Sequence, residues 1–128
     1  MVFIDKETND LSYKIIGCAY NAHKELGPGL LESAYETCLC YELSKIEINY
    51  EKQKGLPIIY KDVTLDCGYR IDILVENKIV IELKTVEKLL PIHTAQIMTY
   101  LKLSNKHLGL LFNFYNANLQ NGIKRYVL

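Results

Sequence analysis

Two acidic residues and a lysine lie inside runs that otherwise resemble buried strands. Residues 70–84 read RIDILVENKIVIELK, so Asp72 and Glu82 are ten positions apart and Lys84 follows two residues later. Side chains alternate along a strand, so Arg70 and Asp72 should share one face and Ile71 and Ile73 the other. By the same rule, Glu82 and Lys84 should share a face of the next strand. If the chain turns through residues 76–78, with Val75 opposite Ile79, Asp72 lies directly opposite Glu82 with Cβ atoms about 5 Å apart.

Two carboxylates held that close repel each other unless a proton or a cation lies between them. A hard divalent cation such as Mg²⁺ could bind both carboxylates, a backbone carbonyl and several waters. Lys84 would then lie beside a metal-bound water or a phosphate, where its charge could assist hydrolysis. The alternative is a solvated hairpin end with Lys84 as an ordinary ion-pair partner, and the spacing alone leaves both interpretations open.

The surrounding pattern predicts two helices, a meander of antiparallel strands, a third helix and two closing strands. Asp10 is the expected N-cap of the first helix, GPG at residues 27–29 should end it, and Pro91 should open the third helix. The expected order is therefore ααββββ-α-ββ, an α/β fold with a mixed sheet flanked by helices. The expected helices cover residues 11–26, about 30–44 and 91–103, and the expected strands 46–53, 56–60, 63–75, 78–83, 107–114 and 123–128.

Composition narrows the class of protein. The chain has 128 residues, 49% of them hydrophobic, which suits a single domain over residues 1–128. Lys plus Arg and Asp plus Glu each total 15, so net charge gives no overall attraction to nucleic acid. The four cysteines lack the spacing of a zinc site, and we expect buried, reduced thiols. With no signal-like start and no run of ~20 apolar residues, we expect a cytoplasmic protein without a membrane partner.

Several motifs together resemble a known group of nucleases. Asp72, the triplet Glu82-Leu83-Lys84 and the later Gln96 resemble the PD-(D/E)XK nuclease superfamily, although Ile71 stands where the superfamily name has Pro. The segment QIMTY, Gln96 to Tyr100, is similar to the QxxxY element of the RecB-like exonuclease branch. GLLESAY, HKELGPG, LGLLFNF and GIKRYVL resemble the GxxExxY protein family of the same superfamily, so the resemblance covers nearly the whole chain.

This resemblance implies a fold, a cofactor and roles for individual residues. The fold would be the restriction-endonuclease-like core, and the cofactor Mg²⁺ or Mn²⁺, ligated by Asp72 and Glu82 with Glu32 as a further acidic ligand. Lys84 would serve the attacking water. Gln96 and Tyr100 would line the site and position the substrate phosphate or the lysine.

Four residues have a structural alternative beside a role in the site. Glu32 could be a solvated acid in the first turn of its helix, and Tyr35 could be a core aromatic instead of a substrate contact. His23 is a candidate substrate-binding residue, but its position near the end of its helix favours an interaction with the helix dipole instead. Arg70 could contact a phosphate or pair with a strand acid.

The expected function is Mg²⁺-dependent hydrolysis of phosphodiester bonds in DNA, that is, a metal-dependent deoxyribonuclease. The alternative is a nuclease-fold module with little or no catalysis that binds nucleic acid or a protein within a larger complex. The balanced charge and small size favour that alternative. A homodimer could supply additional binding surface.

Overall fold

The computed structural model describes residues 3–128 and contains three α-helices and a short 3₁₀ helix. Asp5 caps the first helix by accepting a hydrogen bond from the backbone N–H of Thr8, whereas Asp10 forms an ion pair with Lys6 inside the helix. The predicted N-cap at Asp10 is therefore wrong, because the helix begins more than one turn earlier. The helices are α1 (Lys6–Leu26), α2 (Glu32–Lys45), α3 (Pro91–Ser104) and the 3₁₀ helix η1 (Leu119–Gly122).

Five strands form one mixed sheet in the order β1-β4-β5-β6-β7. Neighbours pair antiparallel except β5 and β6, which are parallel because α3 carries the chain across one face of the sheet between them. This arrangement confirms the predicted α/β fold. The strands are β1 (Tyr50–Gly55), β4 (Arg70–Val75), β5 (Ile79–Lys84), β6 (Leu108–Asn113) and β7 (Ile123–Val127).

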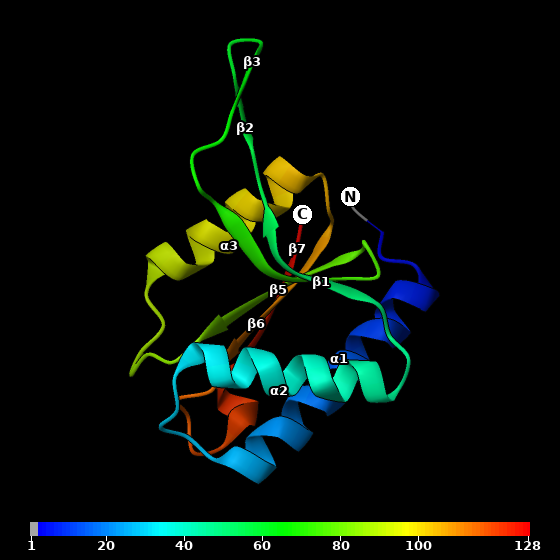
Figure 1. Cartoon of the computed structure of the whole chain (residues 1–128), viewed down its shortest axis with the longest axis vertical. Helices are drawn as coiled ribbons and strands as arrows, with labels where there is room; N and C mark the ends of the chain where they lie inside the picture. Colours follow the sequence, from blue (N-terminus) through cyan, green and yellow to red (C-terminus); the bar gives the residue numbers. More distant parts are fainter. Residues whose placement is uncertain (1–2) are drawn as a thin grey trace.

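The predicted meander of consecutive strands is wrong in one respect. Strands β2 (Ile58–Tyr60) and β3 (Val63–Leu65) pair only with each other, and β1 pairs with β4. The run at residues 63–75 thus splits into two strands, so five strands and not four precede α3. Figure 1 shows β2 and β3 as a ribbon that projects beyond the sheet. Its turn residues Lys61 and Asp62 both have positive φ, as tight hairpin turns require.

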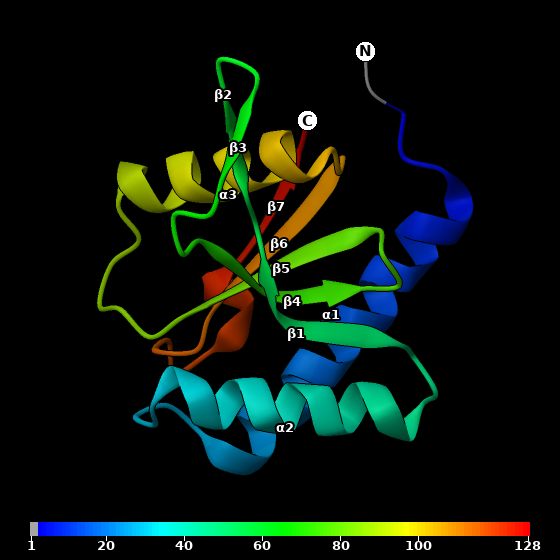
Figure 2. The same ribbon diagram turned by 45° about the horizontal axis from the view of Figure 1, so that its top comes forward.

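Helices cover both faces of the sheet, as Figure 2 shows, with α2 on one side and α3 on the other. One apolar cluster joins α1 and α2 to the first face through residues such as Ile15, Leu39 and Ile81. A smaller cluster joins α3 to the opposite face, with Ile97 and Leu101 against Val80. All six residues of β6 are buried, so this strand is covered on both faces.

The four cysteines are free thiols in different surroundings. Cys18 and Cys40 are buried, Cys38 is half-buried and Cys67 is exposed. The expectation of buried thiols is therefore right for two of them and wrong for Cys67. Cys67 lies in the loop between β3 and β4, and this loop exists because the predicted strand at residues 63–75 is broken into two. Within residues 3–128, the helices are too short or too polar to cross a bilayer.

Candidate active site at the opening between two strands

The hairpin of β4 and β5 has the register that the sequence predicts. Val75 lies opposite Ile79, and Ile73 lies opposite Ile81. The turn residues Glu76 and Asn77 both take left-handed backbone conformations. The regular ladder ends at Ile73 and Ile81, one position before Asp72 and Glu82 would pair.

Side chains replace the missing ladder bonds at Asp72 and Glu82. The backbone N–H of Leu83 donates to Oδ2 of Asp72 over 2.8 Å, and the N–H of Asp72 lies 3.4 Å from Oε1 of Glu82. The two carboxylates therefore lie together at the point where β4 and β5 separate. Their proximity, expected from the register alone, is present in the structure.

The strict alternation predicted around Asp72 does not hold. Ile71 packs in the cluster beneath α3, whereas Ile73 packs in the cluster beneath α1 and α2, so these two residues do not share a face. The pairing of β4 with β1 also omits Asp72 and its opposite residue Gln53, which has a φ of 51°. Because Asp72 leaves the ladder on both sides, the strand can twist there and move Ile71 to the other face.

Glu82 is buried and forms no ion pair with another residue of the described chain, 3–128. Glu82 is 3% exposed. Its burial and, to a smaller extent, the nearby carboxylate of Asp72 raise the pKa of Glu82 to about 9. None of the ion pairs among residues 3–128 includes Asp72, Glu82 or Lys84. The alternative, an ordinary hairpin end in which Lys84 forms an ion pair with the acids, is therefore wrong. Carboxylate oxygens that lie this close together are the donor set that suits Mg²⁺ or Mn²⁺.

Lys84 instead points to α3. Its ammonium group donates to Oε1 of Gln96 over 3.0 Å, and the amide group of Gln96 donates to the hydroxyl of Tyr100 over 3.1 Å. Gln96 and Tyr100 lie four residues apart and so share one face of the helix. Burial raises the pKa of the Tyr100 hydroxyl, while the hydrogen bond from Gln96 opposes that effect. The lysine, glutamine and tyrosine named from the sequence thus form one connected chain beside the acids.

The end of β5 is held by a residue that the sequence analysis missed. Asn113, on the parallel neighbour β6, accepts from the backbone N–H of Val86 and donates to its carbonyl over 3.1 and 2.8 Å. The N–H of Phe114 donates to the carbonyl of Lys84 over 2.9 Å. These bonds position the backbone on both sides of Thr85. The signal was a lone polar residue inside the otherwise apolar run LGLLFNF.

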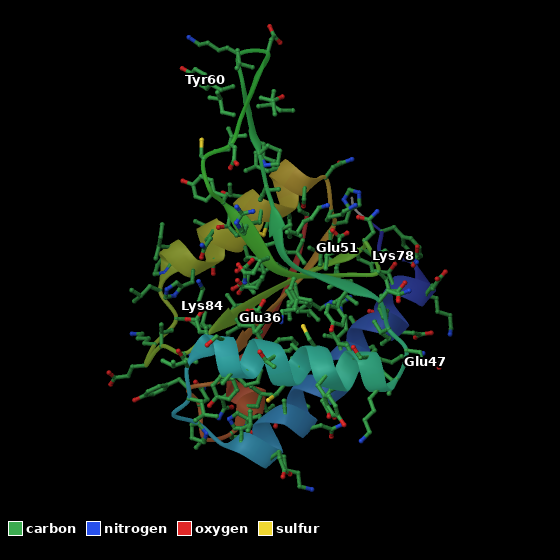
Figure 3. All side chains as sticks on the ribbon, in the orientation of Figure 1. Glu36, Glu47, Glu51, Tyr60, Lys78 and Lys84 are labelled. Atoms are coloured by element: carbon green, nitrogen blue, oxygen red, sulfur yellow. The ribbon has the colours of Figure 1, made fainter. Side chains whose placement is uncertain are left out.

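The beginning of α2 approaches the acids without completing a group of three. Burial raises the pKa of Glu32. The charge of Lys84 and the hydrogen bond from the backbone N–H of Thr85 act in the opposite direction and lower it. Gln53 was also missed, and its amide donates to Glu36 over 3.0 Å and lies 3.4 Å from Asp72. Figure 3 shows Lys84 at the end of β5 and Glu36 on α2. No cluster of three or more His, Cys, Asp or Glu suited to a metal ion occurs in the described part of the chain.

The other predicted substrate-binding residues have different positions. Tyr35 is fully buried and stacks on Phe114 with ring centroids 4.4 Å apart. Its hydroxyl donates to the carbonyl of Gly27 and accepts from the N–H of Leu30, so the core alternative holds for Tyr35. His23 is buried and hydrogen-bonds the carbonyl of Asn116 over 2.8 Å, which uses its imidazole within the fold. Arg70 is exposed, and within residues 3–128 it forms no ion pair.

One comparison with known proteins agrees with this fold. A family model described as the PD-(D/E)XK nuclease superfamily matches residues 9–126. Neither a curated protein nor a solved structure matches the chain. The matched residues include both acids, the lysine and all of the sheet except Val127, the last residue of β7.

Proposed function

Because this chain belongs to the PD-(D/E)XK nuclease superfamily, we propose that it hydrolyses phosphodiester bonds in DNA with Mg²⁺ or Mn²⁺ as cofactor. The observation that carries the proposal is the close approach of Asp72 and Glu82, beside Lys84, at the opening between β4 and β5. Two acids brought together in this way weaken a fold unless they bind a cation or share a proton.

The chain offers oxygen ligands for the metal at this opening. Asp72 and Glu82 would hold the ion, with a backbone carbonyl of β5, and Glu32 would act from α2 through solvent or after a local movement. A divalent cation supplies activation of water and neutralisation of charge on the scissile phosphate. The buried position of Glu82 keeps bulk water from weakening these electrostatic effects.

The remaining groups would handle the phosphate and the proton. Lys84 can orient the attacking water or stabilise negative charge on the phosphate, because its ammonium group is held within reach of the acids by Gln96. Tyr100 orients the amide group of Gln96. Arg70, exposed at the start of β4, would contact a neighbouring phosphate.

The finer assignments are proposals as well. GLLESAY and QIMTY support placing the chain in the GxxExxY family and near the RecB-like branch. The second candidate function is a nuclease-fold binding module with little catalysis, active within a cytoplasmic complex or as a homodimer. The balanced charge of the chain and the lack of a third assembled acid among residues 3–128 favour this candidate.

The test is cleavage of linear and circular DNA, single- and double-stranded, with Mg²⁺ or Mn²⁺. Wild type is compared with Lys84→Ala and Asp72→Ala, and Lys102→Ala on the exposed side of α3 serves as the matched lysine control. Metal-dependent cleavage that is lost in the first two variants and kept in the third supports the hydrolase. A folded wild type that binds metal and cuts none of these substrates would favour the binding module.

A further inference from the structure

A groove runs between the base of the β2–β3 ribbon and the exposed side of α3. Its volume is about 240 Å³. One wall comes from the ribbon and the segment after it, and the other comes from successive turns of α3. The residues that shape it include Ile58, Tyr69, Ile92, Gln96, Tyr100 and Leu103.

The lining is suited to a flat, uncharged group. None of the described residues that line the groove is charged, so it offers no countercharge to a phosphate. Tyr69 is 46% exposed, and its ring meets that of Tyr100 edge to face with centroids 6.3 Å apart. Ile92 is 65% exposed on the opposite wall. An aromatic ring and an aliphatic side chain facing a narrow space are the usual surroundings of an unstacked nucleobase.

The groove is continuous with the catalytic residues. Gln96 and Tyr100 line it, and the same two side chains connect to Lys84 by hydrogen bonds of 3.0 and 3.1 Å. A group bound there would therefore lie next to the place where the phosphate is held. We propose that the groove binds an unpaired nucleobase of the strand being cut, so that the substrate is single-stranded DNA or a duplex with unpaired bases at the cleavage point.

This inference rests on the proposed hydrolase and adds the class of substrate to it. In an intact duplex the base faces are stacked and the outer surface is phosphate, which an uncharged groove does not attract. A second copy of the chain could also cover apolar side chains, but a protein surface in this groove would cover Gln96 and Tyr100. It would then obstruct the proposed active site.

The ribbon extends the same surface away from the site. Ile59, Tyr60, Val63 and Leu65 are all exposed, and a two-stranded ribbon has little stability of its own in water. Figure 3 shows Tyr60 near the end of the ribbon, far from Lys84. Tyr60, 58% exposed with the ammonium group of Lys61 5.4 Å from its ring, provides a further stacking position with a nearby cation. The ribbon would hold bases farther along the strand.

The experiment measures binding separately from cleavage. A 2-aminopurine oligonucleotide, as a single strand and as a duplex of the same sequence, is titrated with protein in Ca²⁺, and its integrity is checked on a gel. Stacking on a tyrosine should change the fluorescence of the single strand. Tyr69→Ala should weaken single-strand binding about tenfold or more, Tyr69→Phe should retain it, and duplex binding should stay unchanged.

Matched controls and the cleavage assay distinguish the outcomes. Tyr41→Ala removes a tyrosine that is 64% exposed on α2, outside the groove, and should leave binding unchanged. Equal effects of Tyr69→Ala and Tyr41→Ala, or no binding of either oligonucleotide, would overturn the base-binding groove. A protein dimer that Tyr69→Ala dissociates, without oligonucleotide binding, would also overturn it and assign the groove to a second copy.

Failure of the hydrolase would look different. Tyr69-dependent binding of single strands without cleavage in Mg²⁺ or Mn²⁺ would support the groove and reject the hydrolase. Cleavage that is equal on duplex and single strand, and unaffected by Tyr69→Ala, would support the hydrolase and reject the groove.

Discussion

The ammonium group of Lys84 donates a hydrogen bond to the side-chain oxygen of Gln96 over 3.0 Å, joining the end of β5 to the face of α3. This bond holds the ammonium group of Lys84 beside the acid pair, and among residues 3–128 Lys84 forms no ion pair. Lys84 thereby stays available to a water or a phosphate.

Gln96→Leu should lower the rate of DNA cleavage about tenfold to a hundredfold, because Lys84 loses the contact that orients it. The substitution should also change the pH dependence of the rate, which a purely structural role would leave unaltered. Steady-state kinetics across pH measure both effects, and Lys102→Ala on the same helix is the control. Unchanged kinetics in Gln96→Leu would remove Gln96 from the positioning of Lys84.

The buried acid makes the stability of the metal-free protein depend on pH. The pKa of Glu82 is raised from 4.5 to about 9, first by burial and then by Asp72, so between these values the folded state binds more protons than the unfolded state. The free energy of unfolding in EDTA should therefore fall as pH rises from about 5 to about 8. Urea denaturation at several pH values measures the slope.

Glu82→Gln should flatten that slope, while Glu25→Gln on the exposed side of α1 should not. Mg²⁺ should raise the midpoint of thermal unfolding at about pH 8 in wild type and much less in Glu82→Gln, because the cation replaces the proton between the acids. A slope that persists in Glu82→Gln would show that another group is responsible.

Asp72→Asn separates stability from activity. Asparagine keeps an oxygen that can accept from the N–H of Leu83 but removes the negative charge beside Glu82. Above the pKa of Glu82, where both carboxylates are charged, we expect the metal-free protein to gain up to about 1 kcal/mol in the free energy of unfolding. Cleavage should fall more than about a hundredfold with the loss of a metal ligand. Chemical denaturation and the cleavage assay test this, and a less stable variant would contradict it.

Tyr35→Phe tests the loop that leads into α2. The hydroxyl bonds both the carbonyl of Gly27 and the N–H of Leu30, so its removal should cost about 1–3 kcal/mol. Hydrogen exchange at Leu30 and Leu31 should accelerate, because this loop loses its attachment. Tyr41→Phe, at an exposed position on α2, should stay within about 0.5 kcal/mol of wild type. Equal stabilities would assign no structural role to the Tyr35 hydroxyl.

The cysteines should differ in reactivity. Burial raises the pKa of Cys40 to about 11 and also raises that of Cys18, whereas Cys67 is exposed. Because the thiolate is the reactive form, a thiol reagent should label Cys67 first in the folded protein. Mass spectrometry identifies the labelled residue, and Cys67→Ser should lack the fast phase. Rapid labelling of Cys40 would contradict the buried environment.

Local patterns were sufficient for much of the fold. GPG ends α1 at Leu26, and Pro91 is the first residue of α3, since both act through their own backbone conformations. The β4–β5 register was also predictable, because the side-chain period of two and the length of the turn together select it. The match over residues 9–126 agrees with the superfamily that these motifs resemble.

The errors in strand pairing and in the exposure of Cys67 have a common cause. A strand's own residues indicate that it is a strand but not which partner it selects, so the pairing of β1 with β4 and the separation of the β2–β3 ribbon were not predictable. The partner depends on which apolar faces can be covered together by α1, α2 and α3. The exposure of Cys67 follows from the same choice, because the loop between β3 and β4 exists only in this topology.

The sequence by itself determined which groups could do chemistry, namely Asp72, Glu82 and Lys84. It also determined the strand register that brings the two acids to one place. Only the tertiary structure decided their surroundings, namely the burial of Glu82 and the contacts of Gln53 with Asp72 and of Asn113 with Val86. Periodicity selects the face on which a side chain lies, because it is a property of one strand. Burial and hydrogen-bond partners come from other segments, and their positions follow from the packing of the whole chain.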